Sequence, residues 1–208
     1  MVLERGEQSL VIDPGSYTLP LDHLTNVAAI VLTHEHADHW TPEHLRRLRD
    51  RNPHARIFGT EATVRAAAAE DIDTIELVRP GDEISVGEFQ LRFFGGRHAI
   101  IHSSIPQIDN VAVLVNELFY YAGDSFAVPE VDVQVLAAPA SGPWMKIAET
   151  MDYIMKLAPK RAIAVHELVN SQIGNDLAKA RMSWATEQVG GSFSWLSPGE
   201  SLELSPDA

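Results

Sequence analysis

The feature that most constrains this chain is a histidine-rich segment, Thr33-His34-Glu35-His36-Ala37-Asp38-His39, which directly follows an apolar run. The apolar run, residues 27–32, predicts a buried strand, so the histidines come where that strand gives way to a loop. His34 and His36 are two residues apart, which suits an extended or turning backbone, whereas helical metalloprotease sites use His-Glu-x-x-His. Because His and Asp are costly to bury unless paired or coordinated, the segment predicts metal ligands presented on a loop.

Composition bounds the class of protein. The chain has 208 residues, of which 45% are hydrophobic and 22% charged, and no linker is recognisable, so we expect a single domain over residues 1–208. The formal net charge of −13 disfavours nucleic acid as a partner, because a polyanion would meet a repulsive field. The absence of cysteine excludes disulfides, thiolate nucleophiles and Cys-type zinc sites.

Targeting signals are not recognisable in the sequence. Residues 1–7 carry no signal-peptide pattern, and no apolar run approaches the roughly 20 residues needed to span a bilayer. We therefore expect a cytoplasmic protein with no membrane partner. The expected partner is a small-molecule substrate. The sequence leaves homo-oligomerisation open.

The order of predicted elements indicates the fold class. Helices are expected from Thr41-Pro42, an N-cap followed by proline at the first helical position, and over residues 61–70, 144–157 and 175–189. Two sets of strands alternate with these helices, which predicts an α+β fold with two sheets packed face to face and helices outside, a four-layer αββα sandwich. The expected strands are 3–5 and 9–12 as a hairpin, 27–32, 56–59, a second antiparallel group at 73–78, 84–86 and 89–94, a hairpin of 110–115 and 118–122, then 131–137, 161–165 and a closing hairpin over 193–204.

Several polar residues share one kind of position, the place where a predicted strand gives way to a loop. Ligands at the ends of several strands converge on one rim of a sheet, where open α/β architectures build their sites. Nitrogen and oxygen donors without sulfur favour Zn²⁺ and permit Mn²⁺ or Fe²⁺. The residues so placed are Asp13, His34, His98, Asp124 and His166.

These ordered motifs resemble the metallo-β-lactamase superfamily over nearly the whole chain. The resemblance implies two divalent metal ions, the first held by His34, His36 and His98, the second by Asp38, His39 and His166, with Asp124 bridging both. It gives Asp13 the role of bracing the histidine-rich loop. Redox members of the superfamily carry Glu where His36 stands, so the resemblance favours a hydrolase.

The segments 95–102, 123–125 and 139–144 resemble the ascorbate-6-phosphate lactonase-like branch of that superfamily. The implied activity is hydrolysis of an ester, lactone or phosphodiester bond of a small molecule by a hydroxide that bridges the two metals, with Asp38 or Asp124 accepting the proton of the water. Members of the branch usually begin with an additional strand, so we expect the outermost strand here to be short or missing.

Two alternatives to this activity stay open. One is a nuclease-like phosphodiesterase, against which the net acidity and the lack of an RNA-binding insertion count. The other is a non-catalytic protein that keeps the metals for structure. Seven ligands for two metals count against it, since structural sites are usually closed and four-coordinate.

Further candidates lie beside the expected ligands. His98 and His102 both follow the strand at 89–94, and His98 is the expected ligand because it comes directly after Gly95-Gly96. His102 is expected to contact substrate or to cap a turn. Trp144, at the start of a predicted helix, is expected to wall the substrate pocket or to lie in the core. Arg97 and Lys146 are the nearby cations that could receive a phosphate or carboxylate.

Overall fold

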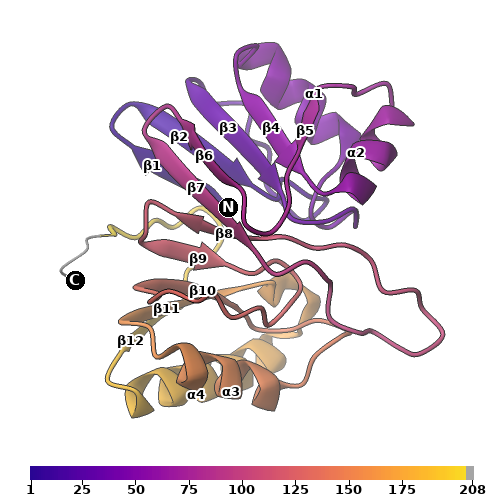
Figure 1. Ribbon diagram of the computed structural model, residues 1–208. Helices are drawn as coiled ribbons and strands as arrows, with labels where there is room; N and C mark the ends of the chain where they lie inside the picture. Colours follow the sequence, from indigo (N-terminus) through magenta and orange to yellow (C-terminus); the bar gives the residue numbers. More distant parts are fainter. Residues whose placement is uncertain (205–208) are drawn as a thin grey trace.

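The computed structural model describes residues 1–204 as four layers, two β-sheets between two pairs of helices (Figure 1). The first sheet has the order β1-β2-β3-β4-β5, with strands Val2–Arg5, Gln8–Ile12, Val27–Leu32, Arg56–Gly59 and Ile75–Leu77. The second has the order β12-β11-β10-β9-β8-β7-β6, with strands, from β6 to β12, Glu83–Val86, Phe89–Phe94, Ala112–Val115, Phe119–Tyr121, Val135–Pro139, Arg161–Val165 and Ser192–Ser194. The α-helices are α1 (Pro42–Arg51), α2 (Glu61–Ala68), α3 (Ile147–Leu157) and α4 (Gln172–Gln188), and a 3₁₀ helix η1 spans Glu167–Val169.

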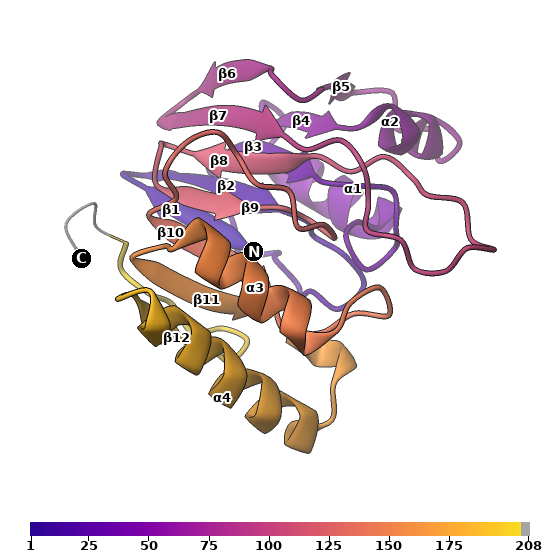
Figure 2. The same ribbon diagram turned by 60° about the horizontal axis from the view of Figure 1, so that its bottom comes forward.

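Apolar side chains fill three spaces between these four layers. Successive residues of a strand point to opposite faces, so Leu10 and Ile12 of β2 enter the core between the sheets, while Val11 packs under α1 and α2. In the same way Val113 of β8 faces the first sheet and Leu114 packs toward α3 and α4. Both sheets are therefore covered on both faces, as Figure 2 shows, and the predicted αββα sandwich is confirmed.

Strand direction decides where the candidate ligands meet. β2, β3 and β4 run parallel to one another. In the second sheet β8 is antiparallel to both β7 and β9, and β9, β10 and β11 are parallel, so β7, β9 and β11 point the same way. Within each sheet the loops that follow these strands therefore leave at one end. Residues from the loops after β3, β7, β9 and β11 cluster together, so the two ends meet at one rim of the sandwich.

Three sequence predictions of strands were wrong. The segment 73–78 was expected in the second, antiparallel group, but β5 pairs parallel with β4 because α2 forms a strand-helix-strand crossover between them. The closing hairpin over 193–204 is absent from the described residues; β12 follows the α4 crossover and pairs parallel with β11. The strand expected over 131–137 begins at Val135, where its neighbours Phe119 and Arg161 begin their ladders.

The remaining expected elements lie close to their predicted bounds. The Thr41 hydroxyl caps α1 by accepting from the His44 amide at 3.2 Å. The outermost strand, expected to be short or missing, is the four-residue β1, antiparallel to β2. Among the described residues, no helix is long and apolar enough to cross a membrane.

Candidate metal centre

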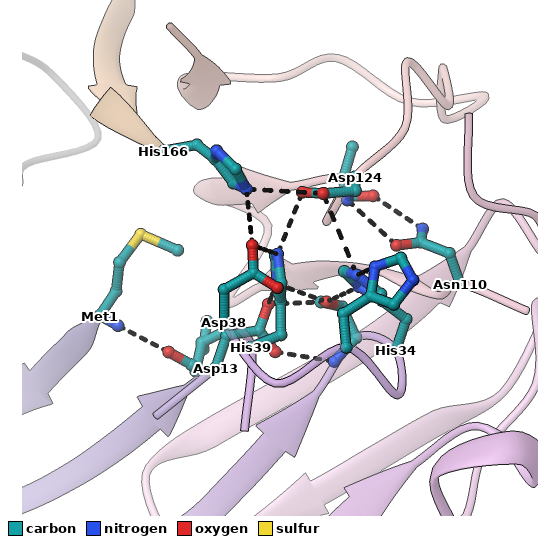
Figure 3. Close-up of polar contacts among 12 residues, drawn as sticks. Met1, Asp13, His34, Asp38, His39, Asn110, Asp124 and His166 are labelled. Atoms are coloured by element: carbon teal, nitrogen blue, oxygen red, sulfur yellow. Dashed lines mark hydrogen bonds and ion pairs between the residues drawn. The ribbon is translucent and has the colours of Figure 1, made fainter. Parts of the chain in front are cut away.

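Seven ligand-type side chains meet at the rim of the sandwich in two clusters. Within each cluster one donor atom per residue lies within 4.8 Å of the others. Asp124 joins the clusters, because its Oδ1 is 3.2 Å from His39 Nε2 and its Oδ2 is 3.4 Å from His98 Nε2. Figure 3 shows Asp124 facing His166 on one side and His34 on the other. The first cluster is His34, His36, His98 and Asp124, and the second is Asp38, His39 and His166.

Asp13 holds the histidine-rich loop from behind. Its backbone adopts a positive φ of 50° directly after β2, which turns the carboxylate toward the end of β3. One oxygen accepts from the Thr33 amide at 2.8 Å, and the other accepts from the Thr33 hydroxyl at 2.6 Å and faces His39 Nδ1 at 2.6 Å. A proton on Nδ1 leaves His39 Nε2 free to face the clusters, which is how a carboxylate orients a ligating imidazole. The geometry fits the bracing role that the resemblance implies for Asp13.

Gly15 lets the Asp13 turn lie against the same loop. A Cβ at Gly15 would lie 1.8 Å from the Asp38 carbonyl oxygen and 2.5 Å from the His39 nitrogen. The Ser16 amide donates to the Ala37 carbonyl at 2.9 Å, so the two segments run in direct backbone contact. No side chain other than hydrogen fits there.

Gly15→Ala is therefore expected to destabilise the protein by about 1–3 kcal/mol and to lower its metal content, because Asp38 and His39 must move to admit the methyl group. Thermal melting and elemental analysis of the purified variant measure both effects. Gly174→Ala is the control, since Gly174 lies in α4 outside both clusters, has no positive φ, and a Cβ there would come no closer than 3.2 Å to its nearest neighbour, the Asn170 side chain. A variant at position 15 with native melting and native metal content would contradict the close contact.

Asp124 is fixed by two residues distant in sequence. Asn110 accepts from the Asp124 amide at 3.1 Å and donates to the Ala122 carbonyl at 2.9 Å. The Trp144 indole nitrogen donates to Asp124 Oδ2 at 2.7 Å. Trp144 lies in the loop before α3, not in the helix as expected, and its ring is buried edge-on to His98. Trp144 is buried next to the clusters, and whether it walls a substrate pocket stays a prediction.

The two histidines of the second sheet are oriented by the backbone. His98 Nδ1 lies 2.5 Å from the Ala99 carbonyl oxygen, so this nitrogen carries the proton and Nε2 faces Asp124. His166 has a left-handed backbone, with φ 63°, at the start of η1, and its carbonyl accepts from the Ser141 hydroxyl. A strained backbone of this kind persists only where its surroundings hold it, and it often marks a functional site.

Buried polar atoms at the centre point to bound cations. Among the described residues, His39 Nε2, His98 Nε2, both ring nitrogens of His166 and Asp124 Oδ1 are buried without a hydrogen-bond partner. Leaving such atoms unpaired is expensive, and native structures rarely do so without a ligand or ion. His34 Nε2 and His36 Nδ1 also face each other at 3.1 Å. Five imidazoles and two carboxylates aimed at one space fit divalent metal ions with nitrogen and oxygen ligands.

Protonation differs between the two clusters in the metal-free protein. Burial, with the neighbouring imidazoles, lowers the pKa of His34 and His36. Burial opposes protonation of His39 and His166 as well, but nearby carboxylates outweigh it and raise their pKa values to about 10 and about 9. The pKa of Asp124 is held well below its usual range by His166, His39 and His98, against the effect of burial. His34 and His36 are therefore neutral ligands near neutral pH, whereas His39 and His166 must release protons to bind a cation.

The metal-free protein is expected to lose stability as the pH rises from about 7 to about 9. Because the folded pKa values of His39 and His166 lie above the ordinary 6.5, the folded protein holds protons that the unfolded chain has released. This stabilisation is complete below pH 6.5 and is lost as the pH rises through about 9 to 10. Urea unfolding midpoints in EDTA at the two pH values measure it. His166→Gln should flatten the dependence and His44→Gln, outside the clusters, should keep it; a midpoint that rises with pH would refute the assignment.

His102 is the expected site residue that lies apart from the clusters. It is on an exposed loop, where its Nδ1 accepts from the Ser104 amide at 3.1 Å and lies 2.7 Å from the Ser104 hydroxyl. This is the turn-capping alternative, and contact of His102 with substrate stays a prediction. Sequence reasoning missed Gly15 and Asn110, although Gly15 belongs to the Asp-Pro-Gly turn and Asn110 precedes an apolar run.

Comparison with known proteins places the seven clustered residues within a known family. Residues 1–166 match the family described as "Beta-lactamase superfamily domain", a span that includes all seven clustered residues. Protein Rv0786c of Mycobacterium tuberculosis is 37% identical over 174 residues, which are 81% of this chain and 80% of that protein.

Solved structures share the architecture at low identity. Igni18, described as a metallo hydrolase from the archaeon Ignicoccus hospitalis, has a TM-score of 0.71 at 18% identity and covers 97% of this chain and 92% of its own. CmlA, a diiron β-hydroxylase from Streptomyces venezuelae, has a TM-score of 0.72 at 13% identity over 92% of this chain and 50% of its own. At these identities the likeness concerns the fold. Together with the family match and the relative in Mycobacterium, it confirms the wider resemblance: the chain belongs to the beta-lactamase superfamily and has the metallo-β-lactamase fold.

Proposed function

We propose that the protein is a metal-dependent hydrolase that cleaves an ester, lactone or phosphodiester bond of a small molecule at a dinuclear centre. The observation that supports this most is the sharing of Asp124 between two clusters whose buried donor atoms lack partners. Two divalent ions held there would supply a water acidic enough to act as a nucleophile at neutral pH. Zn²⁺ suits the ligand set best, and Mn²⁺ or Fe²⁺ are compatible with it.

The side chains of this chain have separable roles in that proposal. Asp124 fixes the distance between the two clusters. Asp38 is half-buried, lies 3.4 Å from His166 Nε2, and has a pKa lowered mainly by that contact, so it is an anion able to accept a proton from the attacking water. In ester hydrolysis the acyl C–O bond breaks, the water oxygen joins the acyl carbon and the leaving oxygen takes a proton. Asp13 and Trp144 orient His39 and Asp124 and take no part in bond breaking.

The histidine at position 36 favours hydrolysis over oxidation. His36 Nδ1 lies 3.1 Å from His34 Nε2 and belongs to the first cluster, so an imidazole takes the position where redox relatives were expected to carry a carboxylate. Membership of the ascorbate-6-phosphate lactonase-like branch and a cytoplasmic location stay predictions.

Metal content and a substrate panel test the proposal together. Elemental mass spectrometry of the purified protein should find close to two equivalents of a transition metal. The same preparation should hydrolyse at least one member of an ester, lactone and phosphodiester panel, and EDTA treatment should abolish the activity until metal is restored. Full metal loading without activity on any member would favour the non-catalytic alternative.

A further inference from the structure

A cavity of about 140 Å³ opens beside the second cluster. It lies between the ends of β2 and β11 and is bounded by η1. Asp38, His39 and His166 form one side, so a group bound in the cavity would lie against the second cluster. We call it the Leu168 cavity; its apolar wall is formed by Ile12, Tyr121, Val165, Leu168 and Val169.

The wall leaves two large aliphatic side chains open to solvent. Leu168 is 52% exposed and Val169 is 50% exposed, and Tyr17 on the opposite side is 57% exposed. Apolar surface gathered at a concave site next to polar groups is typical of ligand-binding sites. The cavity is close in size to an engineered apolar cavity of about 150 Å³ that binds benzene, so a short alkyl or a ring would fill it.

Apart from the histidines of the second cluster and the metal ions that they would bind, the described lining of the cavity offers an anionic ligand no cationic side chain. Among the described residues, its lining contains no Lys or Arg side chain, whereas Asp13, Asp38 and Glu167 contribute carboxylates. The Met1 amino group also lies in the wall, but it donates to the Ile12 carbonyl at 2.6 Å, and burial lowers its pKa.

The two cations expected to receive a phosphate lie elsewhere. The Arg97 guanidinium donates to the Gln107 carbonyl at 2.7 Å and pairs with Asp109 at 3.4 Å, which turns it toward its own loop. Lys146 is exposed at the start of α3. Phosphate sites commonly add Arg, Lys or helix-terminal amides, so a phosphate in this cavity would be held by the metal ions alone.

We propose that the substrate is a neutral carboxylic ester or lactone whose short apolar group occupies the Leu168 cavity, an inference that rests on the proposed hydrolase function. The scissile carbonyl would then lie next to Asp38 and His166, and hydrolysis would consume one water and release an acid and an alcohol. Phosphodiesters and phosphorylated lactones are poor substrates in this view. Each methylene buried in the cavity should improve kcat/KM about fourfold.

Kinetics of the zinc-loaded full chain test this preference. The probes are p-nitrophenyl acetate, p-nitrophenyl butyrate and bis(p-nitrophenyl) phosphate, with each rate divided by that of uncatalysed hydrolysis. Two added methylenes should give butyrate about a 15-fold advantage over acetate, and the phosphodiester should be accelerated least. Val169→Trp, which fills the cavity, should reduce the butyrate advantage to about twofold or less. Ile173→Trp is the control, because Ile173 is 74% exposed and outside the cavity, and it should keep the native ratio.

A binding measurement separates the cavity from the chemistry. In saturation-transfer NMR with zinc-loaded protein, butyramide should receive more saturation than dimethyl phosphate, and Val169→Trp but not Ile173→Trp should abolish the difference. Hydrolysis with a preference for the phosphodiester, or a butyrate advantage untouched by Val169→Trp, overturns the inference and leaves the hydrolase proposal standing. Cavity-dependent butyramide binding without hydrolysis of any member of the ester, lactone and phosphodiester panel refutes the hydrolase proposal and supports the cavity assignment. If the protein neither hydrolyses any of these substrates nor binds butyramide in the cavity, the hydrolase proposal and the cavity assignment are both wrong.

Discussion

Asp124→Ala is expected to lower the metal content from about two equivalents to one or fewer and to reduce kcat/KM for any substrate by about 1000-fold or more. The carboxylate lies between the two clusters, since one oxygen is 3.2 Å from His39 Nε2 and the other is 3.4 Å from His98 Nε2. If two ions are bound as proposed, the variant would remove the ligand that they share and weaken the activation of water that a pair of ions supplies. Elemental mass spectrometry and steady-state kinetics on the same preparation measure both losses.

The control for Asp124→Ala is Asp132→Ala. Asp132 is an exposed carboxylate in the segment before β10, outside both clusters, so its removal changes net charge equally and should leave metal content and activity unchanged. Circular dichroism of both variants tests whether the fold is retained. Two equivalents of metal and native activity in a folded Asp124→Ala protein would show that Asp124 does not join the two ions.

The candidate metal centre is built from loops of both sheets. His34 follows β3 of the first sheet and Asp124 follows β9 of the second, and the Val111 amide donates to the Thr33 carbonyl at 2.9 Å between them. Gly123 makes this approach feasible, because a Cβ there would lie 2.3 Å from Asn110 Oδ1 and 2.9 Å from Thr33 Cβ. The geometry of the centre thus depends on the packing of the sheets, and mutations in the core between them should alter metal binding from a distance.

The clustered residues could be predicted from sequence because they are polar, ionisable side chains that directly follow buried apolar strands. His and Asp directly after buried strands are costly unless they pair or bind a metal, and five strand ends carry them, so their meeting at one rim follows from strand direction. The supporting contacts were not predictable in this way. Asn110 and Trp144 reach Asp124 across 14 and 20 positions of sequence, and Gly15 matters only because another loop lies against it.

The errors in the predicted pairing of β5 and β12 have a common cause. Residues 73–78 have a clear strand pattern, but periodicity does not say which sheet a strand joins, and the α2 crossover assigns β5 to the first sheet. Residues 193–204 alternate in the manner of a hairpin, yet β12 finds its partner in β11 after the α4 crossover. In both places the pairing partner is set by the preceding helix, and the local pattern fixed only the strand character.

Asp13→Ala is expected to weaken metal binding at the second cluster about 10- to 100-fold while changing the affinity of the first cluster much less. Asp13 is buried, with 8% of its surface exposed, and it contacts none of the first-cluster donor atoms. It accepts the Nδ1 proton of His39 and thereby fixes the orientation of His39 Nε2. Its removal also leaves the Thr33 amide and the Nδ1 proton of His39 without a buried acceptor. The metal-free variant should accordingly lose about 3–5 kcal/mol of stability.

Competition with a chromophoric chelator measures the two affinities of Asp13→Ala, and urea unfolding in EDTA measures its stability. Asp22→Ala is the matched control, because that carboxylate is 53% exposed and only pairs at 3.8 Å with Arg47 on the surface, where an ion pair contributes little. A selective loss at the second cluster distinguishes the positioning role from general destabilisation, which would weaken both clusters together. Equal weakening of both would mean that Asp13 acts only through the stability of the fold. Native affinity at the second cluster would mean that His39 is oriented without Asp13.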